Sequence, residues 1–321
     1  MKLTRRLALT ALLATAVLPT LPALAADKVQ VGKSVAFAWT FTPLEVGVEK
    51  GFFAKHDLEL EIISFAGDAK MQQGLASNSI QLSLGSGPGL GFLAKGVPAK
   101  GVAAYANAPL SMGVAVRADS AAQSFADLKG LRMGVTTVGS LSDWLTQRLA
   151  LDQGWANTDI VSVPVGGAPS TRAAMETDQI DAAMIALEVA YQLENEGEWR
   201  VIGQASDYVD EFITHVVFAT DDVIANNPDL VKRFLTGLWE TLDWMKANKD
   251  EAVAITANVL QIPPEVIART YDMEMPMFTE AGEFDPAAMD VLRQSFVEMQ
   301  ILPEAPADDV LLTTQFLPVT R

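Results

Sequence analysis

Short apolar runs alternate with amphipathic stretches along most of the chain after residue 26. This pattern predicts strands and helices in turn over 34–39, 43–50, 58–65, 69–77, 80–84, 89–95 and 99–105. A second series repeats it over 131–136, 140–151, 159–163, 170–177 and 182–185. Alternation at this spacing is typical of parallel sheets flanked by helices, so the sequence predicts an α/β fold.

The two series share a unit in which a helix ends, the chain turns and a strand begins. In this unit the stretch 75–82 parallels the stretch 174–181. Asn78 and Asp178 lie where the helices end, and both residue types tolerate the left-handed backbone that such an end requires. We therefore predict two similar α/β lobes rather than one long sheet.

The chain after residue 220 is mainly helical in pattern. Asn227-Pro228 is a typical cap and first-turn pair, and apolar residues recur after it with helical spacing. This stripe predicts a helix with one buried face. Before it, the β-branched and aromatic run 212–219 predicts a strand that returns between the lobes.

The first 25 residues have the order of a cleavable secretory signal: basic residues, then the apolar run 7–18, then small residues at 23–25. The apolar run is shorter than the roughly 20 residues that span a bilayer. We predict cleavage after Ala25, which leaves 296 residues (321 − 25). The pair Arg5-Arg6 leaves the Sec and twin-arginine routes both open. The expected location is the periplasm.

Composition narrows the classes of function. The chain has 40 acidic and 23 basic residues and a net charge of −17, which is the opposite of a nucleic-acid-binding footprint. It has no cysteine, which excludes disulfides, thiolate nucleophiles and cysteine-ligated metals. Two histidines, His56 and His215, are too few for a multi-histidine metal site. We predict neither a metal nor a cofactor.

Several segments, in the right order, resemble the solute-binding proteins of ABC importers. The stretches 35–40, 47–53 and 58–61 resemble the opening of that family. Residues 125–135 (Phe-Ala-Asp-Leu-Lys-Gly-Leu-Arg-Met-Gly-Val) resemble the start of its second lobe, and 179–183 a later turn and strand. The similar branch is the one for nitrate, sulfonates, taurine and thiamine-precursor pyrimidines (SsuA/THI5-like).

This resemblance implies the type II periplasmic-binding-protein fold, in which two lobes close over a ligand. Mapped onto this chain, one lobe comprises 27–110 plus 217–321 and the other 111–216, with crossover strands at 110–116 and 212–219. It also implies a monomer that delivers a small-molecule ligand to an inner-membrane ABC permease. The protein would then not be an enzyme.

Loops at strand ends supply the candidate binding residues, because ligands of such sheets bind beyond the carboxyl ends of strands. An aromatic side chain can wall a ligand, and glycines, hydroxyls and helix-start amides suit an oxyanion. The candidates are Trp39, Phe41, Thr42, Ser86, Gly87, Pro88, Thr137, Gly139, Ser140, Gly167, Ser170 and Glu188. Trp39 could instead pack beneath the first helix, and Ser140 could serve only as a helix cap.

These loops fit several ligands: a sulfonate, taurine, a nitrate-like anion, a pyrimidine or an aromatic acid. Two other functions remain open on the same fold. One is an enzyme of pyrimidine-precursor synthesis, which the export signal and the two histidines disfavour. The other is a sensory binding protein that docks to a receptor rather than to a permease. No Gly-x-Ser-x-Gly elbow supports a hydrolase.

Overall fold

The computed structural model describes residues 26–210 and 212–321, so the predicted signal segment 1–25 lies outside the described residues. Two five-stranded sheets organise the described part, in the orders β2-β1-β3-β10-β4 and β7-β6-β8-β5-β9. The first consists of β1 (Asp27–Lys33), β2 (Leu58–Ser64), β3 (Leu82–Ser86), β4 (Ala99–Ala106) and β10 (His215–Thr220). The second consists of β5 (Met112–Arg117), β6 (Arg132–Val135), β7 (Val161–Pro164), β8 (Ala182–Ala186) and β9 (Trp199–Gln204).

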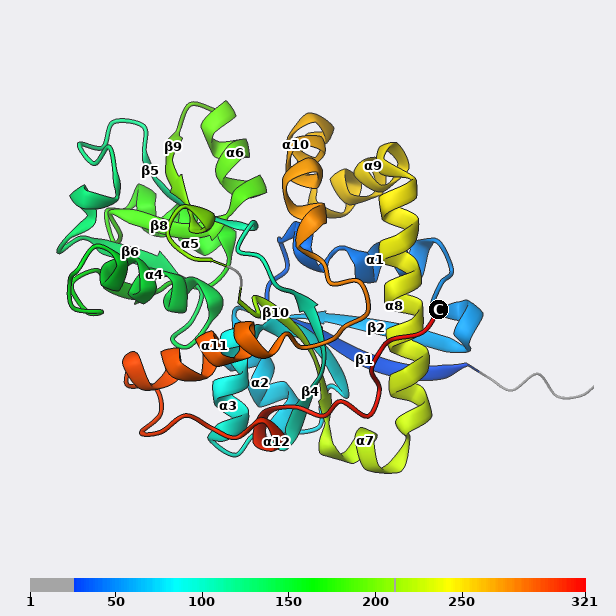
Figure 1. The fold of residues 1–321 in the computed structure, drawn as a ribbon. Helices are drawn as coiled ribbons and strands as arrows, with labels where there is room; N and C mark the ends of the chain where they lie inside the picture. Colours follow the sequence, from blue (N-terminus) through cyan, green and yellow to red (C-terminus); the bar gives the residue numbers. More distant parts are fainter. Residues whose placement is uncertain (1–25, 211) are drawn as a thin grey trace, which may run out of the picture.

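Helices complete each lobe (Figure 1). The first lobe contains α1 (Pro43–Glu49), α2 (Asp68–Ala76) and α3 (Leu90–Ala94), with short 3-10 helices η1 (Trp39–Phe41) and η3 (Gly87–Gly89). The second contains α4 (Leu141–Asp152), α5 (Ala168–Glu176) and α6 (Leu187–Asn195). The C-terminal helices are α7 (Asp221–Asn226), α8 (Pro228–Ala247), α9 (Lys249–Leu260), α10 (Pro264–Glu274), α11 (Pro286–Glu298) and α12 (Asp308–Leu311).

Each sheet has one strand that runs against the others. β10 is antiparallel to β3 and β4, and β5 is antiparallel to β8 and β9, whereas β1, β2 and β3 run parallel. The chain passes to the second lobe between β4 and β5 and returns between β9 and β10. These two crossings confirm the predicted two-lobed fold with crossover strands. We propose the predicted lobe limits, 27–110 with 217–321 and 111–216, as working boundaries.

The repeat between the lobes is confirmed, with a corrected register. Asn78 and Asp178 have φ angles of 55° and 54°, which are left-handed, as predicted. α2 and α5 begin at residues 68 and 168, and β3 and β8 at residues 82 and 182, so equivalent positions differ by 100. The predicted pairing of 75–82 with 174–181 is therefore wrong by one residue. Gly67 is equivalent to Gly167, and Asp68 to Ala168.

The strand predicted over 34–39 is wrong. The first strand is β1, in which Val29 and Val31 are buried although polar residues interrupt the run. β1 lies between β2 and β3, so its backbone is paired on both sides. The apolar run that follows leaves the sheet as a loop and continues into η1. Three apolar residues of this run, Val35, Phe37 and Ala38, line the cavity described below.

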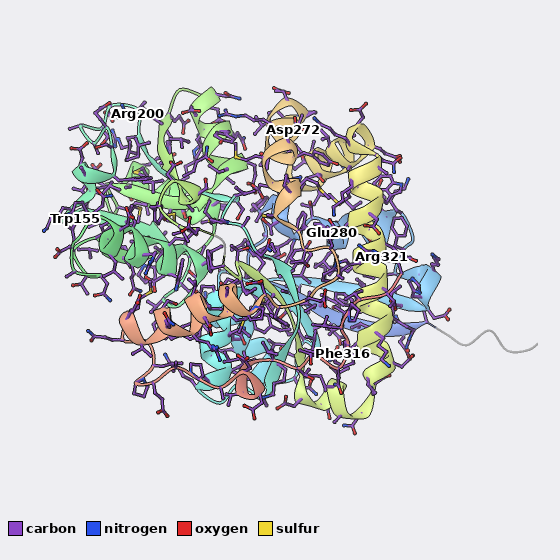
Figure 2. All side chains as sticks on the ribbon, viewed as in Figure 1. Trp155, Arg200, Asp272, Glu280, Phe316 and Arg321 are labelled. Carbon is purple, nitrogen blue, oxygen red and sulfur yellow. The ribbon has the colours of Figure 1, made fainter. Side chains whose placement is uncertain are left out.

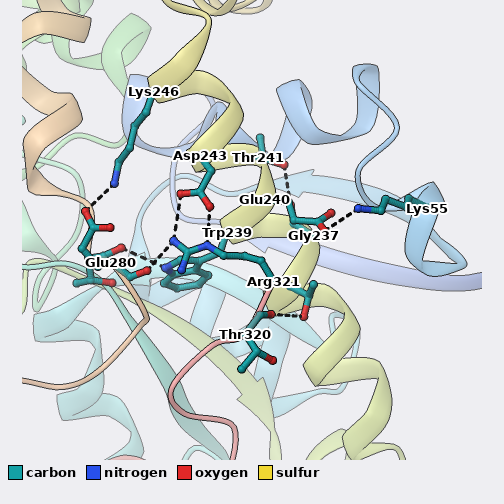
Figure 3. A network of polar contacts seen from close by, with 12 residues as sticks. Lys55, Gly237, Trp239, Glu240, Thr241, Asp243, Lys246, Glu280, Thr320 and Arg321 are labelled. Atoms are coloured by element: carbon teal, nitrogen blue, oxygen red, sulfur yellow. Dashed lines mark hydrogen bonds and ion pairs between the residues drawn. The ribbon is translucent and has the colours of Figure 1, made fainter.

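The C-terminal segment is fastened onto α8 (Figure 3). The Arg321 guanidinium pairs with Asp243, at 2.6 Å between Nε and Oδ2, and donates to the Glu280 carbonyl oxygen. Trp239 Nε1 donates to the carbonyl oxygen of Thr279, 3.1 Å away. The predicted apolar stripe of α8 is buried.

None of the helices in 26–210 and 212–321 combines the length and apolar character that a membrane crossing needs.

Candidate functional site

A cavity of about 70 Å³ lies between the two sheets, at strand ends and helix starts of both lobes. From the first lobe and the two crossings it is lined by Ser34, Val35, Phe37, Ala38, Thr40, Phe41, Asp68, Ser86, Ser111, Met112 and His215. From the second lobe it is lined by Thr136, Leu141, Ser142, Gly166, Gly167, Ala168, Thr171, Met184, Ile185 and Ala186. Pockets for drug-sized ligands are several times larger, so this cavity fits a small solute.

The polar part of the first-lobe wall centres on Asp68 at the start of α2. Its side chain is 3% exposed, and its Oδ1 accepts a hydrogen bond from the Ser86 amide at 2.9 Å. Burial raises the pKa of this carboxyl above its usual range, although hydrogen bonds from Ser86 oppose the shift. Asp68 therefore gives the cavity wall a buried carboxyl group that can accept a hydrogen bond from a ligand or pair with a cation.

His215, at the start of β10, adds no positive charge. It is buried, and burial lowers the pKa of its imidazole to about 3, so the ring is neutral at ordinary pH. Its Nδ1 lies 3.2 Å from Thr214 Oγ1, and the Phe41 ring stands edge-on to it with centroids 5.5 Å apart. The ring offers a ligand one neutral donor or acceptor.

No lysine or arginine is among the lining residues in the part of the chain that the structure describes. Lys33, which precedes the lining residue Ser34, is buried and paired with Glu45. Its charge is therefore balanced within the first lobe. Across residues 26–210 and 212–321, no group of three or more His, Cys, Asp or Glu side chains is placed to hold a metal ion.

The second-lobe wall presents hydroxyls at the start of α4. Thr136 Oγ1 lies 2.9 Å from Ser140 Oγ and 3.1 Å from Ser142 Oγ, so the three hydroxyls form one hydrogen-bonded group. Thr136 and Ser142 line the cavity. Gly166 and Gly167 precede α5 and bring backbone close to the same space. Below them, β8 ends in the apolar residues 184–186.

Three of the predicted binding residues line the cavity: Phe41, Ser86 and Gly167. Trp39 does not. Its indole is fully buried in the first-lobe core, 5.5 Å from the Phe278 ring and 6.0 Å from the Tyr271 ring. Thr42 is also buried there, and its Oγ1 donates to the Trp39 carbonyl oxygen at 2.8 Å. Trp39 therefore packs inside the first lobe, outside the cavity lining.

Gly87 and Pro88 form η3 behind the cavity wall. The Gly87 amide, predicted to face a ligand, donates to the Thr214 carbonyl oxygen at 2.8 Å. A Cβ on Gly87 would lie 1.7 Å from the Ile213 carbonyl oxygen, closer than any side chain can pack. Glycine at this position therefore lets the returning crossing pass against β3.

We expect Gly87→Ala to destabilise the protein by about 3 kcal/mol, because the new methyl must displace backbone. Gly167→Ala is the matched control: a Cβ there meets nothing within 4 Å, so we expect a change below about 0.5 kcal/mol. Urea unfolding followed by tryptophan fluorescence measures both. Equal stability of the two variants would contradict this role for Gly87.

The remaining predicted residues of the α4 loop support the lobes rather than line the cavity. Ser140 is the N-cap of α4, and its Oγ accepts from the Asp143 amide at 3.4 Å. Gly139 is left-handed at φ 78°, and its amide donates to Asp143. Thr137 reaches the first lobe, where its Oγ1 accepts from the Ala69 amide at 3.4 Å.

Ser170 and Glu188 also lie away from the lining residues. Ser170 is exposed on α5. Glu188, on α6 of the second lobe, is 1% exposed, and its Oε1 accepts the Trp39 amide of the first lobe at 2.6 Å. Glu188 was one of the predicted ligand-binding residues, and in the structure its carboxyl accepts from a backbone amide of the opposite lobe.

Comparison with known proteins gives the class first. The alkanesulfonate-binding protein SsuA from Xanthomonas axonopodis pv. citri superposes with a TM-score of 0.77 at 18% identity, covering 91% of this chain and 100% of that one. The nitrate-binding protein NrtA from Synechocystis PCC 6803 superposes with a TM-score of 0.69 at 17% identity, covering 89% and 84%. The fold is that of the periplasmic binding proteins.

Sequence comparison gives the family. The model described as NMT1/THI5 like matches residues 39–252, and the chain belongs to this family. A Brucella abortus (strain 2308) protein named as a binding protein is 30% identical over 232 residues, 71% of this chain and 70% of that protein. A Haemophilus influenzae protein named for thiamine biosynthesis is 28% identical over 261 residues, 78% and 80% of the two chains. The family resemblance predicted from the sequence is confirmed.

Proposed function

We propose that this protein is the solute-binding component of an ABC importer, which captures a small organic solute by lobe closure and delivers it to an inner-membrane permease. The observation that carries this proposal is the cavity, because its wall comes from strand ends of both lobes. A solute there contacts both lobes at once, and binding then favours the closed arrangement. In this function the protein works in the periplasm, after cleavage following Ala25.

The wall chemistry narrows the solute class. The described lining residues carry one carboxyl, on Asp68, together with hydroxyls and a neutral histidine. An oxyanion beside an ionised Asp68 would be repelled, and no lining cation among the described residues compensates. A neutral or cationic group with an N–H donor would complete the hydrogen bonding of Asp68. We therefore propose that the solute presents such a group, as an aminopyrimidine or the amine of taurine does.

Thermal-shift screening of the chain from residue 26 tests the function. The panel contains nitrate, ethanesulfonate, taurine, benzoate, pyrimidine and 4-aminopyrimidine. A ligand at 100 times its Kd stabilises the folded protein by about 2.7 kcal/mol. We expect the largest rise in Tm with a member that carries an amine, and no change in the solute afterwards. Chemical conversion of the solute, measured by NMR, would replace the importer function by an enzyme.

A further inference from the structure

Two buried glutamates meet across the lobe boundary, outside the cavity. Glu188 lies in the first turn of α6 of the second lobe, and Glu274 is the last residue of α10, which packs against α6 and η1. Figure 1 shows α10 beside α6 where the lobes face each other. The two side chains are 1% and 0% exposed. Neither glutamate has a use in the function proposed above.

Both carboxyl groups bind η1, the short helix that carries part of the cavity wall. Glu188 Oε1 accepts the Trp39 amide at 2.6 Å, and Glu274 Oε2 accepts the Thr40 hydroxyl at 3.2 Å. Thr40 itself lines the cavity. Solute binding and the placement of the two glutamates therefore involve the same three-residue segment.

Within residues 26–210 and 212–321, the second oxygen of each carboxyl group has no hydrogen-bond partner. Glu188 Oε2 and Glu274 Oε1 are both buried without a hydrogen bond. An acceptor without a donor is costly in a buried site, and two ionised carboxylates near each other are costlier still. A proton on one of the two groups supplies a donor and removes one of the two charges.

The charged groups on the packed helices are already paired toward solvent. From α10, the Arg269 guanidinium lies 3.5 Å from the centre of the Tyr191 ring, and it pairs with Glu194 of α6 at 4.0 Å. From α9, Lys249 pairs with Asp272 of α10 (labelled in Figure 2) at 2.6 Å, and both side chains are exposed. Neither cation makes an ion pair with Glu188 or Glu274 in the described residues.

The chemistry of the pair agrees with this geometry. Burial raises the pKa of Glu188 to about 7, against hydrogen bonds that lower it. Burial, together with repulsion by Glu188, raises the pKa of Glu274 well above its usual range. Two such groups titrate as a unit, in which the first proton to leave and the second have separate apparent values.

We propose that Glu188 and Glu274 bind a proton when the lobes close, so that closure over the solute is coupled to proton uptake at the lobe boundary. The coupling to solute rests on the function proposed above. In the open arrangement the two groups meet water, and their pKa values are then near the ordinary glutamate value of 4.5. Closure therefore takes up protons where the open pair is ionised and the closed pair is not.

The direction of the pH effect follows from linkage. Because the closed form has the higher pKa, closure is most favourable below pH about 4.5 and weakens as the pH rises through 7. For one proton, solute affinity falls by up to tenfold per pH unit across this window. Glutamine at position 274 is a permanent neutral donor, so it should hold the lobes closed throughout the window.

Spin labels measure closure directly, and the absence of native cysteine makes labelling specific. Asp152→Cys and Asn226→Cys place labels on exposed positions of the two lobes. We expect the label distance to lengthen as the pH rises from 5 to 8, with E274Q staying short and flattening the pH dependence at least threefold. E188Q is the second variant and should flatten it likewise. E240Q is the control, since Glu240 lies on α8 and pairs with Lys55 of the first lobe, away from the boundary (Figure 3).

Each outcome supports or overturns the proposal. A titration of E274Q and E188Q equal to that of the unsubstituted protein overturns it, and so does a label distance constant from pH 5 to 8. Circular dichroism at each pH establishes that a variant is folded. Titration calorimetry with the best solute of the thermal-shift panel separates the two proposals. If the affinity for this solute does not change with pH, the proton coupling is overturned and the binding function stands. If no solute of the panel binds while the label distance still depends on pH, the binding function is overturned and the proton coupling at the boundary remains.

Discussion

Asp68→Asn is expected to reverse the preference of the cavity between amine-bearing and amine-free solutes. Asp68 is the one lining carboxyl among the described residues, and a charged hydrogen bond to a buried ligand is worth about 1.5–3 kcal/mol. The affinity for 4-aminopyrimidine or taurine should fall about 10- to 100-fold. The affinity for ethanesulfonate should rise, because the buried negative charge is gone. Isothermal titration of each pair of solutes measures the reversal.

The substitution isolates charge from shape. Asparagine keeps the size of the side chain, and its carbonyl oxygen can still accept from the Ser86 amide. Asp143→Asn is the control, because Asp143 is equally buried at the start of a helix but lies outside the lining residues. If the unsubstituted protein binds ethanesulfonate more tightly than taurine, and Asp68→Asn weakens ethanesulfonate, the assignment of Asp68 is wrong.

Trp39→Ala is expected to lower stability by about 3–5 kcal/mol, the usual cost of removing a fully buried large aromatic side chain. The indole packs against the rings of Tyr271 and Phe278. Its removal therefore leaves a cavity between η1 and the C-terminal part of the chain. A loss of this size lowers Tm by at least about 6 °C. Differential scanning calorimetry provides the measurement.

Trp155→Ala is the matched control, since Trp155 is only half-buried on the second lobe, where Lys129 lies 5.5 Å from the centre of its ring (Figure 2). We expect it to cost less than about 1.5 kcal/mol. If Trp39→Ala leaves Tm unchanged and abolishes solute binding, the indole belongs to the binding site and not to the core.

Much of the fold could be predicted from the chain. The alternation of apolar runs and amphipathic stretches located α1 to α5, and Asn78 and Asp178 marked the helix ends. The first strand could not be located in this way. β1 is paired on both sides, yet Lys28 and Gln30 interrupt its apolar pattern, while the more apolar run after it borders a cavity. Apolar runs also occur where residues line a ligand cavity, so hydrophobicity alone does not locate a strand.

The candidate site was predicted less well. The glycine- and hydroxyl-rich loops were placed beside the cavity, but a loop sequence does not tell which amides are already bonded. Gly87 and Ser140 illustrate this, because their polar groups bind the protein itself. Asp68 was missed as a lining residue although the signal was present. The repeat, aligned by its left-handed residues, makes Asp68 the equivalent of the first residue of α5, in a loop already predicted to bind.

The same repeat has a consequence for how a guest molecule is oriented. Where the first lobe presents Asp68 and Ser86, the equivalent positions of the second lobe carry Ala168 and Ala186, and all four line the cavity. At these equivalent positions the cavity wall is therefore polar in the first lobe and aliphatic in the second. We therefore expect a solute to bind with its polar group at Asp68 and Ser86 and with an apolar part against Ala168 and Ala186, which fixes its orientation between the lobes.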